Sequence, residues 1–420
     1  MNDVPVVLAP VGANGARRRL FDDVRYGRVR AVKSQADRAS WPELDALSRT
    51  PQDPGWHAEG DVLVHTDMVL GECATSERAL ERDGDRELVR LACLLHDIAK
   101  PFTTRRDEEV GRVIARGHER MGGVHVRQAL HESGLTGPER RMLSELVATH
   151  HLVKRSVKRA DDEGARAALE RLATRVDTRL LWALEDADMR GRICEDREEQ
   201  LEIVALFRML CEERGLFGAA PSPWVDDNDA SSIRWADARA KRYALDEVQR
   251  RRLAGTVTDK WQALALAHEL SRATPAEVIV TIGLSGSGKS TALSELDASW
   301  TVISPDEWRA EHYGDASEQG DPAVVHRACR EQLKEVLRAK GRAVYDATNL
   351  VADLRAQLLN VCHAYGAHVT LWVFDVAPSV AMARNRQRER RVPDWVIARQ
   401  ASKFEWPGPE EAHAVRVIEG

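Results

Sequence analysis

Apolar residues recur at helical spacing through the first half of the chain. The pattern runs from residue 61 to about 172, as in Leu88, Leu91 and Leu95, and resumes between 180 and 211. One face of an α-helix repeats at intervals of three and four residues, and β-branched alternation is sparse here. This half of the chain is therefore predicted to be all-α.

A different pattern begins after Pro275. Short β-rich runs at 277–283, 301–304, 342–347 and 368–374 alternate with helix-favouring segments. Strands that alternate with helices are typical of a mostly parallel sheet. The sequence thus predicts a multidomain protein in which an all-α part precedes an α/β part.

Glycines, prolines and acidic residues interrupt the helical pattern near the middle of the chain. Gly215, Pro221 and the acidic run 226–229 lie close together, and such clusters break regular elements. The stretch from about 232 to 272 is charged and favours helix, either as a connector or as a small helical layer between the halves. We therefore divide the chain into a helical domain at 41–214, a connector at 215–272 and an α/β domain at 273–420.

Residues 1–40 carry a basic stretch with weak periodicity. Arg17, Arg18 and Arg19 are adjacent, and three more arginines follow by residue 30. A solvated, charged face is the ordinary interpretation of such a run. We expect a poorly ordered arm or an edge element, to which no function is assigned.

Composition places the chain among globular proteins with more than one core. Its 420 residues exceed what one hydrophobic core usually supports, and 43% are hydrophobic and 30% charged. The apolar runs are too short for a bilayer, no signal-peptide pattern is present, and the six cysteines form no Cys-x-x-Cys pair. These features predict a cytoplasmic protein with no membrane partner.

The net charge does not by itself favour binding to nucleic acid. It is −6, whereas strong phosphate binding normally appears as a basic footprint. The distribution of charge matters more than its sum, because five arginines lie between 384 and 391.

Residues 283–290 fit the phosphate-binding pattern G-x-x-x-x-G-K-[ST]. They follow a β-rich run and precede a helix-favouring segment, which is the context that a P-loop requires. Glycines let backbone N–H groups surround phosphate oxygens, Lys289 adds a positive charge, and Ser290 offers a hydroxyl to Mg²⁺. The site is predicted to bind ATP or another nucleoside triphosphate with Mg²⁺. The residues assigned to it are Gly283, Ser285, Gly286, Ser287, Gly288, Lys289, Ser290 and Thr291.

Polar residues also follow the next strands of the predicted sheet. Asp306 comes just after the run 301–304, at the strand end where α/β sheets bind ligands, and its carboxylate can accept a hydroxyl proton. Arg309 lies three residues on and could grip a phosphate of the acceptor. Arg384 and Arg388 are four apart, and we expect them on one helical face that reaches the triphosphate.

Histidines and aspartates concentrate in the helical half. His96 and Asp97 end an apolar run, and His65, His118 and Asp188 lie on neighbouring helical segments. Imidazole and carboxylate groups together can hold a divalent ion, and distance along the chain is no obstacle in a helix bundle.

The α/β half resembles the polynucleotide 5′-kinase family over about residues 275–420. The resemblance rests on the P-loop, Asp-x-x-Arg at Asp306, Asp-x-Thr-Asn at Asp346 and Arg-x-x-x-Arg at Arg384. It implies that Asp306 is the general base on a 5′-hydroxyl and that Arg309 holds the acceptor's phosphate. Lys289 and the paired lid arginines, Arg384 and Arg388, complete the implied catalytic set.

The helical half resembles the HD phosphohydrolase superfamily over about residues 57–190. The resemblance implies one or two divalent transition-metal ions, of Mn, Ni, Co, Zn or Fe. Their ligands would be His65, His96, Asp97 and Asp188, with His118 and His150 at a second position. His151 is a possible substitute for His150, and His57 either contacts substrate or caps a helix.

The order of the two halves, with the segment from Trp56 to Val62 before His65, is similar to the HD-Pnk family of bacterial end-healing enzymes. This resemblance implies phosphorylation of 5′-hydroxyl ends, and removal of 2′-phosphate or opening of 2′,3′-cyclic phosphate ends. The expected partners are RNA or DNA ends and a ligase that acts downstream. Two alternatives stay open: an HD nucleotide phosphohydrolase fused to a small-molecule kinase, and a regulatory ATP-binding module without turnover.

Overall fold

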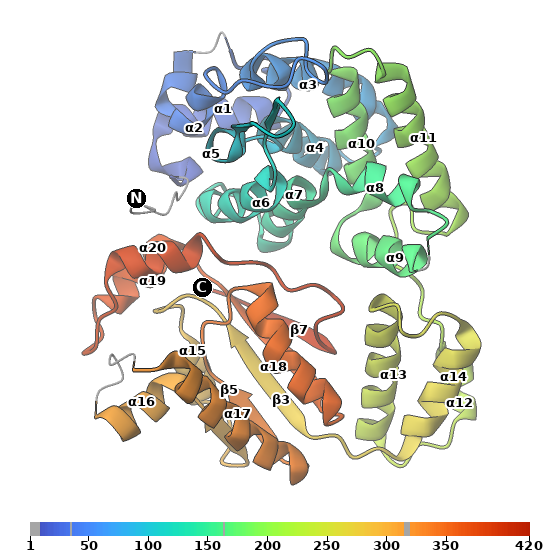
Figure 1. Ribbon diagram of the computed structural model, residues 1–420, viewed down its shortest axis with the longest axis vertical. Helices are drawn as coiled ribbons and strands as arrows, with labels where there is room; N and C mark the ends of the chain where they lie inside the picture. The colour runs from blue at the N-terminus through green and yellow to red at the C-terminus, as the bar shows by residue number, and fades with distance from the viewer. Residues whose placement is uncertain (1–8, 34–35, 163, 315–319) are drawn as a thin grey trace. The chain divides into compact units, whose positions relative to one another are not determined.

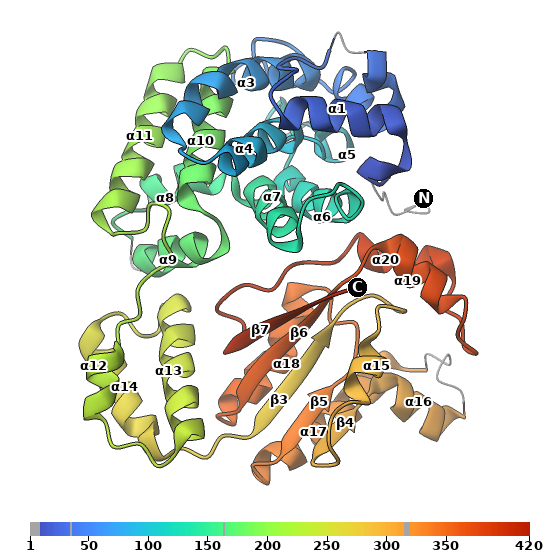
Figure 2. The ribbon, with the colours of Figure 1, turned by 180° about the vertical axis from the view of Figure 1, so that it is seen from behind.

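Two separate units make up the computed structural model, which describes residues 9–33, 36–162, 164–314 and 320–420. One unit ends at Pro221 and the other begins at Ser222 (Figures 1 and 2). No described helix combines the length and apolar character needed to cross a membrane.

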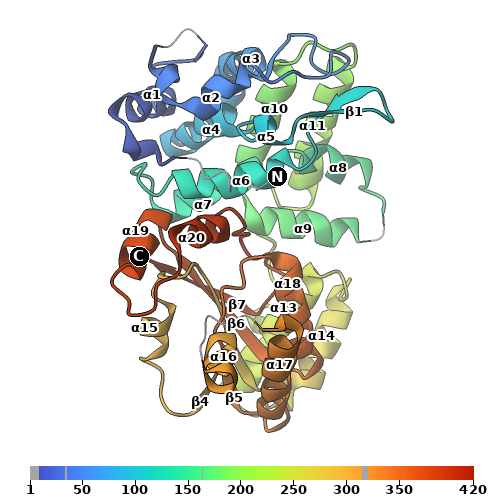
Figure 3. The same ribbon diagram turned by 60° about the vertical axis from the view of Figure 1, so that its left-hand side comes forward.

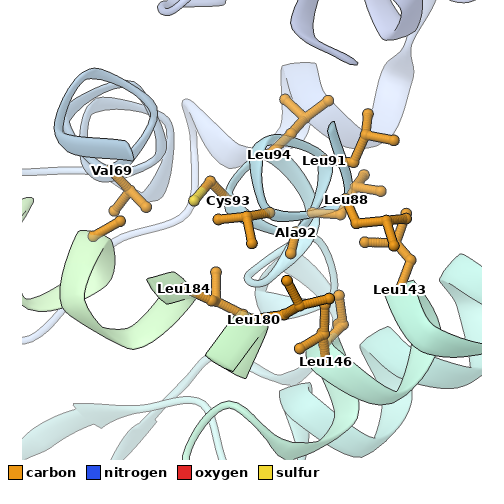
Figure 4. Close-up of a cluster of buried hydrophobic side chains, with 14 of the residues drawn as sticks. Val69, Leu88, Leu91, Ala92, Cys93, Leu94, Leu143, Leu146, Leu180 and Leu184 are labelled. Atoms are coloured by element: carbon orange, nitrogen blue, oxygen red, sulfur yellow. The ribbon is translucent and has the colours of Figure 1, made fainter. Parts of the chain in front are cut away.

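The first unit is a bundle of helices built around α4 (Asp83–Leu95). The second half of this helix is buried on nearly every side, because apolar side chains fill residues 91–95, and all of its charged residues precede Leu91. Leucines of α7 (Gly137–Thr149) and α10 (Thr178–Arg190) and Val69 of α3 (Val62–Ser76) surround it (Figure 4). The remaining helices are α2 (Pro42–Leu47), α5 (Lys100–Thr103), α6 (His118–Ala129), α8 (Leu152–Lys158), α9 (Ala165–Arg175) and α11 (Arg197–Glu213).

The basic N-terminal stretch is not the loose arm that we expected. It contains α1 (Gly15–Arg25), whose Leu20, Phe21 and Val24 are buried in the core of the bundle. These apolar residues lie among the arginines and share one helical face, while Arg17 and Arg25 pair with carboxylates of neighbouring segments. Nearby carboxylates thus compensate these positive charges, and the helix can pack against the core. Residues 1–8 lie outside the described part of the chain.

A short hairpin interrupts the helical bundle. Strands β1 (Arg105–Asp107) and β2 (Arg112–Ile114) pair in antiparallel fashion between α5 and α6. The sequence pattern did not predict these strands, because each is only three residues long, which is too short for an alternating pattern to stand out.

The second unit contains a five-stranded sheet in the order β4-β5-β3-β6-β7, and every neighbouring pair is parallel. Its strands are β3 (Glu277–Ile282), β4 (Trp300–Ile303), β5 (Arg342–Tyr345), β6 (His368–Asp375) and β7 (Ala414–Glu419). The predicted fold class, a helical domain followed by an α/β domain with a parallel sheet, is therefore confirmed. The sequence pattern missed β7, because this edge strand is largely exposed and lacks an apolar run.

Helices flank the sheet and bring the loops after its strands together. Those that follow the strands are α15 (Lys289–Leu293), α16 (Pro305–Tyr313), α17 (Pro322–Arg338), α18 (Ala352–Ala364), α19 (Pro378–Asn385) and α20 (Asp394–Ala401). Helix α17 packs against β4, β5 and α16, whereas α18 packs against β6; Figure 3 shows α16 and α17 near β4 and β5. In a parallel sheet the carboxyl ends of the strands share one edge, so the loops after β3, β4 and β5 meet there.

The stretch between the two halves forms a small helical layer that belongs to the second unit. Its helices are α12 (Asp227–Ser232), α13 (Ala238–Leu253) and α14 (Lys260–Glu269), and they share a separate apolar cluster. Asp246 and Glu247 of α13 bond to His368 and His413 of the sheet domain at 2.9 and 3.0 Å. These hydrogen bonds connect the helical layer to the α/β domain.

Two candidate active sites

Helix ends converge on the first candidate site, within the helical unit. His65 lies in the first turn of α3, and His96 and Asp97 directly follow α4. His118 begins α6, His150 directly follows α7, and Asp188 lies in the last turn of α10. The described side chains at all six positions are almost completely buried. The structure thus brings together the full set of ligands that the sequence predicted.

Three of these histidines are oriented in the same way. The Nδ1 atoms of His96, His118 and His150 lie 2.7–2.9 Å from the backbone carbonyl oxygens of residues 93, 115 and 147. Since a carbonyl only accepts, each Nδ1 carries a proton and donates it to the backbone. The backbone thereby turns the three Nε2 atoms toward the site.

Asp97 lies between two groups of imidazoles. Its Oδ2 is 3.3 Å from His96 Nε2, and its Oδ1 is 3.1 Å from His118 Nε2. On one side, His65 Nε2 is 2.9 Å from Asp188 Oδ1. Asp97 therefore has one oxygen directed toward each side of the site.

The donor set fits a divalent ion. The ligand atoms of His65, His96 and Asp188 lie within 4.8 Å of one another, and so do those of His118, His150 and His151. The Nε2 atom of His150 is buried and has no hydrogen-bond partner among the described residues. A buried polar atom without a partner is costly, and a metal ion at this position would remove the cost.

Cationic side chains pair with the carboxylates of Asp188 and Asp97. Arg192 donates to both oxygens of Asp188, at 3.1 and 2.6 Å, and Lys100 Nζ is 2.6 Å from Asp97 Oδ2. Burial alone would raise the pKa of Asp188, but Arg192 and His65 hold it well below its ordinary value. Both carboxylates thus remain charged at neutral pH.

Glu59, Lys100 and Arg192 were not predicted from the sequence. Glu59 Oε1 lies 2.8 Å from His57 Nδ1 and 3.0 Å from His65 Nδ1, so it supports both rings. The segment containing His57 and Glu59 did match a family pattern, but only the folded chain reveals which rings Glu59 contacts. Burial lowers the pKa of His57 to about 4. His57 is therefore neutral at physiological pH.

A cavity of about 560 Å³ opens over this site. Its wall includes His118 and His151 from the cluster, together with Trp56. Four cationic residues also line it: Lys100, Arg112, Arg116 and Arg192. Positive charge beside buried imidazoles and carboxylates suits an anionic substrate such as a phosphoester.

The second candidate site is the P-loop of the α/β domain. Gly286 and Gly288 adopt φ angles of 84° and 96°, and a Cβ atom on Gly286 would collide with the backbone oxygen of Ala381. Only glycine tolerates this conformation and this close approach. Ser290 and Thr291 lie in the first turn of α15, where backbone N–H groups are free to bind phosphate.

Gln400 of α20 forms hydrogen bonds with the P-loop, and the sequence did not predict this contact. Its Oε1 accepts from the backbone N–H of Ser285 at 2.8 Å, and its Nε2 donates to Ser285 Oγ at 3.1 Å. Lys289 Nζ donates to the carbonyl oxygens of Gly283 and Leu284 at 3.1 and 2.8 Å. Burial lowers the pKa of Lys289 to about 8, while nearby Asp346 and Asp306 oppose the shift.

Asp306 lies in the first turn of α16 with a largely exposed carboxylate. Arg309 Nη1 is 2.5 Å from its Oδ1, as expected for residues three apart on a helix, and Arg390 Nη1 is 3.5 Å from its Oδ2. Asp346, which follows β5, accepts from Thr281 Oγ1 at 3.0 Å, and burial raises its pKa. Asp306, Asp346 and Lys289 are thus close enough to influence one another electrostatically.

The expectation that Arg384 and Arg388 share a helical face is wrong. Helix α19 ends at Asn385, and the chain then leaves helical geometry. Asn385 is buried, accepts from Val392 N–H at 3.1 Å and donates to Val392 O at 2.7 Å, which closes the loop 386–391. Both arginines nevertheless approach the P-loop, because Arg384 lies beside Gly288 and the charge of Arg388 acts on Lys289.

Comparison with known families agrees with this architecture. Residues 62–189 match the HD domain, and residues 278–407 match the AAA domain described as AAA_33. The chain joins an HD domain to a P-loop AAA domain. Such domains imply a phosphoesterase that uses a divalent metal, and a kinase-type enzyme that uses a nucleotide and Mg²⁺.

Curated relatives of this chain are named multifunctional CCA proteins. The one from Paraburkholderia phytofirmans (strain DSM 17436 / LMG 22146 / PsJN) is 33% identical over 196 residues, which cover 45% of this chain and 44% of that protein. The one from Acidovorax sp. (strain JS42) is 36% identical over 183 residues, which cover 42% and 37%. The chain thus spans less than half the length of these relatives.

A solved structure of the Pnkp1/Rnl/Hen1 RNA repair complex contains a chain with limited likeness. The alignment covers 31% of this chain and 43% of that one, with 19% identity and a TM-score of 0.29.

Proposed function

We propose that the chain is a bifunctional nucleic-acid end-healing enzyme of the HD-Pnk type. Its α/β domain would phosphorylate 5′-hydroxyl ends of RNA or DNA with ATP. Its HD domain would remove 2′-phosphate or open 2′,3′-cyclic phosphate ends, which prepares broken strands for a ligase. The observation that carries the kinase assignment is the exposed Asp306 carboxylate, paired with Arg309 and within electrostatic reach of the P-loop lysine.

In the kinase reaction the acceptor oxygen forms a bond to the γ-phosphorus while the bond to the β–γ bridging oxygen breaks. Asp306 takes the proton of the 5′-hydroxyl, and ADP leaves. Arg309 is positioned to hold a phosphate of the acceptor, and an incoming phosphate would draw this arginine from Asp306. The carboxylate would then be free to act as a base.

Positive groups stabilise the charge that develops on the transferred phosphoryl group. Lys289 would bind the β- and γ-phosphate oxygens, and Arg384 and Arg388 would add charge from the loop side. Ser290 would help to hold Mg²⁺, which would neutralise phosphate charge. Glycine N–H groups of the P-loop would bind the remaining oxygens.

In the HD domain the residues that would hold metal are His65, His96, Asp97 and Asp188, with His118 and His150 at a second position. A bound divalent ion would lower the pKa of coordinated water and neutralise phosphate charge. Asp97 has one oxygen toward each group of imidazoles, which favours two ions over one. Lys100 and Arg192 keep the carboxylates ionised and face the substrate cavity.

The kinase assignment is tested by transfer of labelled γ-phosphate from ATP to a single-stranded 5′-hydroxyl oligonucleotide. The wild type should label the oligonucleotide, and Asp306→Asn should lose at least about a hundredfold in rate, because the base is gone. Glu307→Gln, one residue away, is the matched control and should retain activity. Equal labelling by Asp306→Asn would remove the proposed base, and labelling of metabolites alone would favour the small-molecule kinase.

A further inference from the structure

A second cavity of about 620 Å³ lies beside the P-loop in the α/β domain. Residues after β5, one face of α17, the start of α18 and the end of α20 line it. Gln400 is part of its wall and also bonds to Ser285 of the P-loop. Gln400 therefore lies between the cavity and the P-loop.

The same cavity is adjacent to the proposed acceptor arginine. His326 and Arg330 of α17 line it. Burial, followed by the charges of Arg309 and Arg330, lowers the pKa of His326, so these three side chains lie near one another. The cavity thus has a wall residue, His326, within electrostatic reach of Arg309, and it extends from there to α20.

The charged residues that line the cavity are all positive, although the chain as a whole is acidic. Arg330, Arg399 and Lys403 line it, and none of the described lining residues is Asp or Glu. Within the described part of the chain, none of these three cations forms an ion pair. Many arginines of this protein are paired with carboxylates, so three unpaired cations in one cavity indicate an anionic ligand.

Apolar side chains lie among these cations. Leu354, which is 63% exposed, lines the cavity together with Val351 and Val396. Inorganic phosphate or a polyphosphate would gain nothing from such surface. A single-stranded nucleic acid would, because its bases offer flat apolar faces at regular spacing between the phosphates.

From this combination we infer that the cavity binds the acceptor strand beyond its first nucleotide. Arg330, Arg399 and Lys403 contact the following phosphates, and bases rest on the apolar floor at Leu354. The inference rests on the proposed kinase function and deepens it, because it assigns a binding surface to the part of the acceptor strand beyond its 5′ end. Phosphate contacts of this kind give affinity without sequence preference.

The test compares the double variant Arg399→Gln/Lys403→Gln with the wild type on two acceptors, a 5′-hydroxyl dinucleotide and a 5′-hydroxyl 12-mer. For the 12-mer we expect KM to rise at least about fivefold with little change in kcat, since two phosphate contacts are lost. For the dinucleotide both constants should stay within about twofold, because it is too short to cross the cavity.

Direct binding of the 12-mer, followed by fluorescence anisotropy at several salt concentrations, provides a second readout. Each lost contact to a single strand should reduce the slope of log Kd against log salt by about 0.7, so the double variant should lose about 1.4. Arg327→Gln is the matched control, because Arg327 is exposed on α17 and does not line the cavity. It should leave both readouts unchanged.

Equal KM values on the 12-mer with an unchanged salt slope would overturn the inference. A loss that is the same for both acceptors would also overturn it, since it would indicate a general effect on catalysis. Failure of the wild type to phosphorylate either acceptor would instead refute the proposed kinase function. In that case the salt slope of binding alone decides the role of the cavity.

Discussion

His96, His118 and His150 depend on backbone carbonyls for their orientation. His96 and His150 sit at the ends of α4 and α7, where the last carbonyl oxygens of a helix have no partner within the helix. The imidazoles use these oxygens as acceptors. A helix end thereby gains a hydrogen bond, and the Nε2 atom of the same ring is turned toward the site.

Substitution of Arg192 tests how strongly the residues around the ligands affect metal affinity and phosphoesterase rate. Arg192→Lys would lose the two-point contact with Asp188, because lysine presents a point charge rather than a planar fork. We expect metal affinity and phosphoesterase rate to fall by about tenfold to a hundredfold, with the kinase rate unchanged. Metal content after dialysis and hydrolysis of a 2′,3′-cyclic phosphate would measure both effects.

Arg190→Lys is the control for that variant. Arg190 makes the same two-point contact with Asp186 on the same helix, outside the site. It should leave metal content and hydrolysis unchanged. If both lysine variants lost activity equally, the effect would come from helix stability, and the role of Arg192 in the site would be rejected.

The residue pattern was enough to predict the P-loop, and the resemblance to the HD superfamily singled out the six histidines and aspartates that the structure brings together. They were not enough for Glu59, Arg192 or Gln400. A lone Glu, Arg or Gln is common on any surface, and each of these acquires its contact only when distant segments fold together. Gln400 reaches Ser285, for example, across 115 residues of chain.

Elements with a strong apolar pattern were the ones that the sequence predicted. Helix α4 and strands β3 and β6 carry such patterns. The edge strand β7 does not, and the arginines of α1 concealed its buried face. The end of α19 was missed because helical spacing of arginines persists beyond the point where Asn385 closes the loop with Val392.

The loop 386–391 depends on Asn385, and this provides a prediction for the kinase. Asn385→Ala removes two hydrogen bonds to Val392 and leaves the loop free to move. Each bond is worth about 1 kcal/mol, so we expect kcat/KM for ATP to fall by about tenfold or more. Steady-state kinase assays would show this, and the phosphoesterase rate should not change.

The exposed Gln387 in the same loop serves as the comparison. Gln387→Ala should keep the wild-type kcat/KM for ATP. A wild-type kcat/KM for Asn385→Ala would mean that the loop does not need its hydrogen bonds to Asn385. The structural argument for Arg384 and Arg388 at the triphosphate would then fail.

The contact between α13 and the sheet domain is a charge network rather than a metal site. Glu247, His363 and His413 lie close enough to hold an ion. However, His413 Nδ1 accepts from Val369 N–H at 2.9 Å, so its Nε2 carries the proton and donates to Glu247. Arg250 and Arg251 also bond to Glu247, which leaves little affinity for a cation.

This network predicts a pH-dependent contribution to stability. Burial would raise the pKa of Glu247, but His413 and the two arginines hold it below its ordinary value. A depressed pKa stabilises the fold at neutral pH, and the contribution is lost as pH falls below about 4.3. Glu247→Gln should therefore cost about 3 kcal/mol at pH 7, and less at pH 4.

Denaturant unfolding of the wild type and Glu247→Gln at both pH values would measure this difference. Glu269→Gln, an exposed position on α14, should have no effect at either pH. An equal loss at pH 7 and pH 4 would show that the charge of Glu247 is not what stabilises the contact.

At the scale of the whole molecule, the two units have separate hydrophobic cores. One cluster contains only residues between 11 and 216, and the others only residues between 225 and 412. Each candidate site is built entirely within one unit. We therefore predict two activities on one chain, and each should be removable without an effect on the other.

A single oligonucleotide with a 5′-hydroxyl at one end and a 2′,3′-cyclic phosphate at the other tests this claim most directly. With ATP and a divalent metal, the wild type should convert both ends. Asp306→Asn should convert only the cyclic phosphate, and Asp97→Asn only the 5′-hydroxyl. A wild type that leaves either end unchanged, or a variant that loses both activities, would contradict the account.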